Sequence, residues 1–497
     1  MDCGADRGAM TFRTRFSLQR LPAGVRESLY YASGIIMVRA IGLILLPVNT
    51  RFLSADDYGH LEVLLAFADV GSQLFALALP TALSRFVGAA AGWDERRRVC
   101  AEMFGVALLT ALVFGAAGLA FATPLASVLP GTPTTWEVRM LLIALCTEGL
   151  LAVGLTWLRI RGQAGTFLAL SLGRTVLFAL LSISLLFAGF GVIGILIATA
   201  ASAGAQTLAM VWLVVKDTGI RLRGINWPGL ALYVVPLLLS GIAAFALGTF
   251  DRWILADAVD PAALGLYGVA VRIGVLTAVL LQPFHMWWMP KRFIVLEEPE
   301  GAARSARMVG VGILITLLAA AGVALAGPLV ITLMTPPAFH AAAIYVPWLA
   351  LIYVVQESTS LVAVGCFLRK DGFAPLAINL VAAGVVIALY FVFIPRYGVA
   401  GAIGATLAAQ VLRFALTLAI SYHYARIAYP FGRLALVALF LLAAVGAADA
   451  WGEPLALFLL AGPVLALGAL LTLVLGLVPA VSERWPLLRR FSPLGGR

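Results

Sequence analysis

Fourteen apolar stretches run through this chain of 497 residues and leave few choices for its fold. Each is close to the roughly 20 residues that a helix needs to cross the hydrocarbon of a bilayer. Only helices and closed barrels satisfy all their backbone hydrogen bonds there, and stretches this long and continuous favour helices. We therefore predict an all-α polytopic membrane protein with spans at about 29–50, 60–84, 102–124, 138–160, 166–188, 192–215, 229–250, 264–287, 308–334, 342–366, 373–394, 399–421, 432–449 and 455–479.

Composition leaves little room for a soluble domain. Only 12% of the residues are charged, whereas a soluble domain carries about a quarter. The longest polar pieces are residues 1–27 and the loop at 291–307. Neither could fold a catalytic domain, so the chain is not expected to be an enzyme. It also lacks a Walker motif, which disfavours transport driven by ATP binding to this chain.

Basic residues sort to one side of the predicted spans. Of the 34 Lys and Arg residues, 25 fall on the side of the N-terminus, five lie within spans and four fall on the other side. Cytoplasmic loops carry such an excess of Lys and Arg, so both termini are predicted to be cytoplasmic. The same rule explains the net charge of +10 without a nucleic-acid partner. The four residues on the far side are Arg51, Arg139, Arg252 and Arg396.

An internal repeat divides the chain. GVIGILIATAA at 191–201 matches GVAGAIGATLA at 398–408 with an offset of 207 residues, and Tyr58-Gly59 matches Tyr267-Gly268 with an offset of 209. Both halves begin on the same side, which indicates a parallel repeat about an axis along the membrane normal. The predicted units are a basic N-terminus at 1–27, a six-helix bundle at 28–218, a linker at 219–227, a second six-helix bundle at 228–424, and two further helices with a tail at 425–497.

Short motifs accompany this pattern. A D-x-Y-G turn (56–59) precedes the second span, Asp251-Arg252 closes the seventh, and LGLYGVAVRI (264–273) lies in the eighth. With the fourteen spans and the GVxGxxxAT openings of spans six and twelve, they resemble the polysaccharide-biosynthesis flippases, the Wzx-type O-antigen transporters. That family belongs to the MOP exporter superfamily, together with the lipid II flippase and the MATE drug exporters. The resemblance covers nearly the whole chain, although each motif is short.

The resemblance implies two bundles in a V-shaped, MATE-like arrangement around a cavity that opens alternately to each side. The implied substrate is an oligosaccharide on undecaprenyl diphosphate, moved from the inner to the outer leaflet of a bacterial inner membrane for O-antigen lipopolysaccharide or exopolysaccharide. It implies no cofactor beyond a coupling ion, H⁺ or Na⁺. The implied partners are the lipid-linked substrate, the bilayer, a polysaccharide polymerase and glycosyltransferases.

Charges within spans are costly and face a protein interior or water. Arginine suits a diphosphate because its planar fork makes paired, charge-assisted bonds to phosphate oxygens. Three of the arginines lie near the cytoplasmic third, where snorkelling or a structural pair competes with a cavity role. Arg39 and Arg272 lie too deep to snorkel easily and are the first candidates for cavity cations. The candidate cations are Arg39, Arg272, Arg174, Arg413 and Arg85.

Arg39 also has small and polar neighbours on its helix face, including Ser28, Ala32 and Thr50, as a cavity wall would have. The alternative for Arg39 is an ion pair inside the protein, with Asp69 as its natural partner.

Carboxylates at mid-depth are the candidates for ion coupling. A buried carboxyl group can exchange a proton during transport, or it can simply pair with an arginine. Both interpretations stay open for Asp69, Glu148 and Glu357. The four cysteines show no metal-ligand spacing, so no metal site is expected.

Two other functions compete with the flippase. The same fold would suit a MATE-like cation exporter or a lipid II flippase, but five arginines against four acids within spans is a poor lining for cations. A membrane glycosyltransferase or an O-antigen polymerase would need a large outer loop, and the outer loops here are mostly about a dozen residues or fewer.

Overall fold

The apolar stretches form helices in a computed structural model that describes residues 37, 41–289, 291–368, 373–449 and 453–477. Within these residues every regular element is a helix, and twelve helical units are long and apolar enough to cross a membrane. The chain is therefore a multi-pass, all-α membrane protein. A shorter apolar helix, Ile41–Phe52, is the described part of the first predicted span. Arg39, the basic N-terminus and the C-terminal tail lie outside the described residues.

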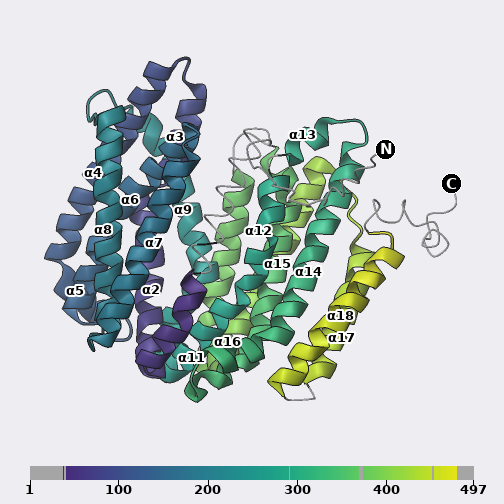
Figure 1. Cartoon of the computed structure of the whole chain (residues 1–497). Helices are drawn as coiled ribbons and strands as arrows, with labels where there is room; N and C mark the ends of the chain where they lie inside the picture. The colour runs from purple at the N-terminus through teal and green to yellow at the C-terminus, as the bar shows by residue number, and fades with distance from the viewer. Residues whose placement is uncertain (1–36, 38–40, 290, 369–372, 450–452, 478–497) are drawn as a thin grey trace, which may run out of the picture.

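The first group of helices packs around α6. It contains α2 (Ala55–Ala76), α3 (Leu79–Ala89), α4 (Trp93–Ala120), α5 (Ala122–Val128), α6 (Thr135–Ile160), α7 (Ala164–Phe187) and α8 (Gly191–Asp217), seen on the left of Figure 1. Helix α6 contacts α2, α4 and α8 and is the most buried of the candidate spans. Its first turn is fixed by a capping box between Thr134 and Glu137, and α2 begins in the same way at Ser54 and Asp57.

The second group of helices follows α8 in the chain. It contains α9 (Trp227–Gly248), α10 (Asp251–Ala258), α11 (Pro261–Gly274), α12 (Leu276–Trp288), α13 (Arg292–Glu297), α14 (Gly301–Met334), η2 (Pro337–Tyr345), α15 (Val346–Val362), η3 (Ala363–Phe367) and α16 (Phe373–Ala425). Helices α17 (Phe431–Asp449) and α18 (Pro454–Val474) pack against α14 at the edge of the molecule (Figure 1). The unit boundaries expected from the sequence remain predictions.

Helix α16 is too long for one crossing. Its 53 residues would span about 80 Å at 1.5 Å per residue, against a hydrocarbon thickness of about 30 Å. Gly398 interrupts it with φ 55° and ψ −131°, a conformation that glycine adopts readily. Gly191, the matching glycine of the repeat, also has φ 55°. The two copies of the motif thus share a backbone feature as well as a sequence.

The second predicted span is broken between α2 and α3. Leu77 and Ala78 have φ of 47° and 50° between α2 and α3, and Pro80 follows in the first turn of α3. A left-handed conformation costs a residue with a Cβ about 1–2 kcal/mol, so this break is held by its surroundings. The eighth predicted span divides between α11 and α12, and Pro283 lies inside α12.

The helices run between two ends of the molecule. We name them the α11 end, where α11 begins, and the α13 end, where α13 lies; they are at the bottom and the top of Figure 1.

At the C-terminus of α8, Asp217 joins three helices. It accepts hydrogen bonds from Trp157 Nε1 at 2.8 Å, Arg161 Nη1 at 2.6 Å and Arg97 Nη2 at 3.4 Å.

Replacing Asp217 with alanine should destabilise the first group of helices. The indole of the almost fully buried Trp157 would lose its acceptor, at a cost of about 1–3 kcal/mol. We expect a lower Tm for the purified variant in detergent. Glu453→Ala is the matched control, because that exposed residue caps α18 without a side-chain hydrogen bond. Equal Tm values for the two variants would contradict this role of Asp217.

Candidate functional site

Helices α2 and α11 meet backbone to backbone at the α11 end. A Cβ atom on Gly59 would overlap the carbonyl oxygen of Pro261, and one on Gly265 would overlap the carbonyl oxygen of Ala55. Only glycine fits at both positions, because the obstructing atoms belong to the backbone. The two groups of helices are therefore in direct contact at this end.

One turn further along α2, Glu62 binds two arginines of the second group. Arg252 Nε lies 3.1 Å from Glu62 Oε2, and Arg272 Nη2 lies 3.2 Å from Glu62 Oε1. The glycines permit this geometry, because Gly268 packs on the Glu62 side chain where a Cβ would clash. Both carboxylate oxygens are thus occupied by residues from the other group of helices.

Asp251 is a second acid beside these arginines. Its carboxylate lies 3.2 Å from Arg252 Nη1 and accepts a hydrogen bond from the hydroxyl group of Tyr267 at 2.5 Å. Arg252 also donates to the carbonyl oxygen of Gly248 at 3.2 Å. We call Glu62, Asp251, Arg252 and Arg272 the interbundle cluster.

The interbundle cluster is neutral but buried. The side chains of Glu62, Asp251 and Arg252 are 6%, 2% and 7% exposed, whereas Arg272 is 33% exposed. Removing one partner from a buried ion pair leaves an uncompensated charge, which typically costs about 3–5 kcal/mol. The cluster can therefore form only while α2 lies against α10 and α11, and separating them exposes charges that need water or another ion.

The guanidinium of Arg272 has N–H donors left for a further hydrogen-bond acceptor. Its guanidinium lies 5.4 Å from the centre of the Tyr58 ring, and its Nε makes no hydrogen bond to the described residues. A guanidinium has five N–H donors, and only one of them binds Glu62. Arg272 is thus both a partner of Glu62 and a partly exposed cation with N–H donors that no other described residue occupies.

Contacts between the groups continue toward the α13 end. Thr249 Oγ1 donates to Asp69 Oδ2 at 3.0 Å, joining α2 to the end of α9. Gly241 of α9 packs on the side chain of Gln73. Near the α13 end, the guanidinium of Arg85 on α3 lies 4.6 Å from the centre of the Tyr233 ring on α9.

A second polar cluster lies inside the second group. His285 Nδ1 of α12 is 3.5 Å from Glu357 Oε2 of α15, and both side chains are largely buried. On α16, Arg413 Nε donates to Asn379 Oδ1 at 2.9 Å, and Asn379 donates in turn to Ser240 of α9 at 3.2 Å. Arg413 here has neutral hydrogen-bond partners and no carboxylate within ion-pair distance among the described residues.

The predicted site residues within the described chain separate into three places. Arg272, Asp69 and Arg85 lie at contacts between the groups, Arg413 and Glu357 lie inside the second group, and Arg174 pairs with Glu148 inside the first at 3.5 Å. The prediction for Arg39, including its pair with Asp69, falls outside the described residues. Among the residues that are described, no cluster of His, Cys, Asp or Glu could hold a metal ion.

Sequence reasoning did not select Glu62, Asp251 and Arg252 as a site. Glu62 is the fourth acid within the predicted spans, beside the three candidates for ion coupling, and Asp251-Arg252 enters the sequence analysis only as a family motif. One signal could have found them: an acid–arginine pair at the end of an apolar helix is costly unless another charge meets it.

These features define a multi-pass, all-α membrane protein in which two groups of helices meet through a buried ion cluster. The chain belongs to the polysaccharide biosynthesis protein family, whose model matches residues 25–291, just over half of the sequence. No curated protein is similar enough in sequence to count as a relative.

Solved structures share the fold at low sequence identity. The chain is similar to the lipid II flippase MurJ in an inward closed conformation, with 12% identity and a TM-score of 0.66 over 89% of this chain and 98% of that one. It is also similar to the MATE multidrug transporter DinF-BH, with 15% identity and a TM-score of 0.58 over 82% and 96%. A MATE family transporter of the MOP superfamily in an inward-facing conformation matches with 16% identity and a TM-score of 0.58 over 78% and 94%.

A methyl group at Gly265 should prevent closure of the α11 end, since it would overlap the α2 backbone. We expect Gly265→Ala to lengthen the distance between spin labels at Thr132→Cys and Asp260→Cys, measured by double electron–electron resonance in a background without native cysteines. Gly384→Ala is the matched control, because nothing lies near a Cβ at that helical position. The same distance distribution in both variants would show that the glycine contact does not control closure.

Proposed function

We propose that the chain is a flippase that moves undecaprenyl-diphosphate-linked oligosaccharide units from the cytoplasmic to the outer leaflet of a bacterial inner membrane by alternating access. Family membership and the shared fold support a transporter in polysaccharide biosynthesis. The observation that carries the mechanism is Glu62, held by two arginines of the opposite group of helices while one of them, Arg272, keeps donors that no other described residue occupies.

The proposed topology has fourteen crossings in two bundles of six with two appended helices. It counts the two segments of α16 on either side of Gly398 separately and adds the helix that contains Ile41–Phe52. By the distribution of Lys and Arg, the α13 end faces the cytoplasm together with both termini, and the α11 end faces outward. The interbundle cluster then closes the outer side.

An anionic head group would weaken this closure. A diphosphate that enters between the bundles meets Arg272 and competes with Glu62 for its N–H donors. The outer contact loses part of its ion pairing whenever Arg272 is taken by phosphate. The substrate thus binds the open state better than the closed state, which is the differential affinity that a ligand-driven change requires.

The carrier lipid would need an apolar surface. A groove of about 730 Å³ lies between α14, α15 and the appended helices, lined by side chains such as Leu317, Trp348, Leu441 and Leu457. Its lining suits a hydrocarbon chain.

Coupling to an ion gradient is proposed for Glu357 and His285. The pair is largely buried, lies between α12 and α15, and contains two groups that can each exchange a proton. Glu148 is less suited because Arg174 already lies beside it. Asp69 remains the alternative, since it contacts α9 across the bundles.

A deletion strain tests the proposed function. Without this chain, surface polysaccharide should disappear while its lipid-linked repeat unit accumulates on the cytoplasmic side. Normal surface polysaccharide in a strain without a paralogue would overturn the proposal. Export of an organic cation by the purified chain, without flipping of the lipid-linked sugar, would favour the MATE-like alternative.

Arg272→Ala should lower flipping in proteoliposomes about tenfold or more, because the head group loses a charge-assisted contact. Arg272→Lys should restore part of the rate, since it keeps the charge without the planar fork. Arg304→Ala is the control, because that exposed arginine pairs only with Glu298 among the described residues. Full activity of Arg272→Ala would exclude a substrate role.

Glu357→Gln should make flipping insensitive to an imposed pH gradient while leaving slow, ungated flipping in place. Glu148→Gln should keep the response of the native chain. Initial rates at several gradients measure both variants, and a normal gradient response in Glu357→Gln would move the coupling site elsewhere.

A further inference from the structure

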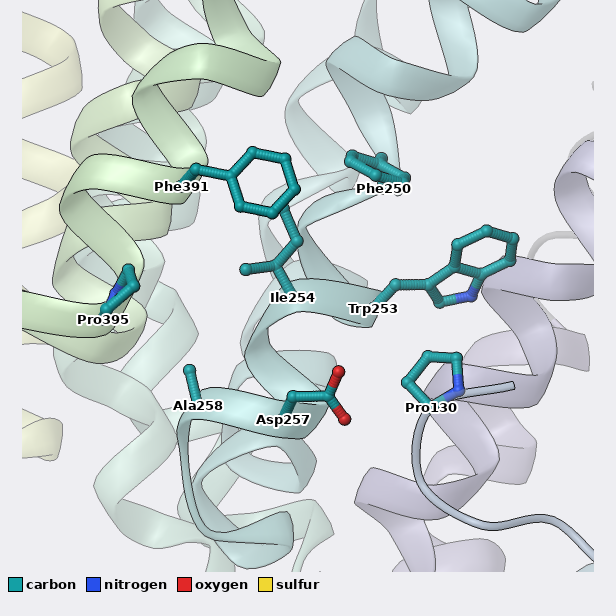
Figure 2. A pocket seen from close by; sticks show the side chains of 8 residues that line it. All are labelled: Pro130, Phe250, Trp253, Ile254, Asp257, Ala258, Phe391 and Pro395. Carbon is teal, nitrogen blue, oxygen red and sulfur yellow. The ribbon is translucent and has the colours of Figure 1, made fainter. Parts of the chain in front are cut away.

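An aromatic pocket lies beside the interbundle cluster at the α11 end. Its volume is about 540 Å³, within the range of about 300–1,000 Å³ that small-molecule sites occupy. Figure 2 shows its lining residues, which come from α10 and the residue before it, from α16, and from the loop before α6: Phe250, Trp253, Ile254, Asp257, Ala258, Phe391, Pro395 and Pro130.

Three aromatic rings give the pocket flat apolar walls. Trp253 is held edge-on by Phe250 and Phe245, with ring centres 5.8 and 5.5 Å away, so its indole is fixed before any ligand arrives. Phe391 stands on the other side of the pocket (Figure 2). A pyranose ring presents C–H groups on its faces and hydroxyls at its edge, so it can pack on rigid rings of this kind and still use its polar groups.

Asp257 supplies the acceptor that such hydroxyls need. It is exposed, and no hydrogen bond or ion pair to another described residue occupies its carboxylate. Its side chain points toward the same space as Trp253, facing Pro130 (Figure 2). An ionised carboxylate accepts hydrogen bonds from hydroxyl or ammonium groups and repels anions. The pocket therefore favours a neutral or amino sugar over a uronic acid or the diphosphate itself.

The pocket shares α10 with the interbundle cluster. Arg252 extends from this eight-residue helix to Glu62, while the neighbouring Trp253 and Asp257 line the pocket. Pro130 closes the pocket from the first group of helices, and every other lining residue belongs to the second. Separation of the groups at the α11 end would take Pro130 away from Trp253, so the pocket has all its walls only while that end is closed.

We propose that this pocket is a saccharide subsite on the outer side, which binds a neutral or amino sugar only while the outer end is closed. The identity of the ligand rests on the proposed function, because glycan is the cargo there. A ligand that binds only the closed state stabilises it, so sugar units released outside shift the chain away from the outward-open form. Binding of released sugar to the subsite would thus slow further opening to the outside, and so reduce the rate of transport.

Saturation-transfer NMR on the full chain in nanodiscs tests the subsite, with galactose, N-acetylglucosamine, glucuronate and tetraphenylphosphonium as probes. We expect saturable binding of the two neutral sugars and weaker binding of glucuronate. Trp253→Ala should weaken sugar binding about two- to tenfold through the lost ring contact. Asp257→Asn should weaken the neutral sugars and reduce the discrimination against glucuronate.

Controls separate the pocket from general effects on folding. Trp212→Ala and Asp260→Asn alter an exposed tryptophan and an exposed acid outside the pocket lining, and should leave sugar binding unchanged. Gly265→Ala, which touches no lining residue but holds the outer end apart, should also weaken binding. Sugar binding that survives Trp253→Ala and Gly265→Ala, or saturable binding of tetraphenylphosphonium alone, would overturn the proposal.

Flipping of lipid-linked oligosaccharide by the native chain is measured in parallel. If flipping occurs and no sugar binds, the subsite is wrong and the proposed function stands. If sugars bind with the expected dependence on Trp253 and Asp257 but no flipping occurs, the subsite stands and the proposed function fails.

Discussion

The shared carboxylate of Glu62 is the interaction on which the arrangement of the two groups depends. Glu62 of α2 pairs with two arginines of the second group and supplies the one negative charge that this group lacks in the cluster, because Asp251 is its only acid there among the described residues. The second group therefore carries a surplus positive charge that is compensated only by contact. That imbalance favours association of the groups and also creates a position for a competing anion.

Close approach of the backbones makes the ion pairing effective. Glycines at 59 and 265 bring α2 and α11 together, and the glycine at 268 leaves room for the Glu62 side chain. Burial lowers the local dielectric and so strengthens the attraction, while it also raises the cost of an unpaired charge. Contact and charge are thus coupled: neither the glycine packing nor the ion pairs would hold the end closed as well alone.

Much of the fold could be predicted from the sequence, because membrane spans depend on local composition. The length and apolarity of each stretch located the helices, and the GVxG repeat located Gly191 and Gly398, which share an unusual φ. The interbundle cluster could not be predicted in this way. Glu62 meets Arg252 and Arg272 across separations of 190 and 210 residues, and no local pattern encodes which acid meets which arginine. His285 could not be predicted for the same reason, since its partner Glu357 is far from it in the sequence although their helices are in contact.

The break at Leu77 and Ala78 has a consequence for leakage. Helix α2 makes the contact at the α11 end, whereas α3 carries Arg85 to Tyr233 near the α13 end. A straight, rigid span would couple the two ends, so that bringing the groups together at one end would move them apart at the other. The two left-handed residues interrupt the helix between these contacts, and both contacts exist at once in this structure. In the proposed transport cycle, a state with contacts between the groups at both ends leaves no continuous path for ions.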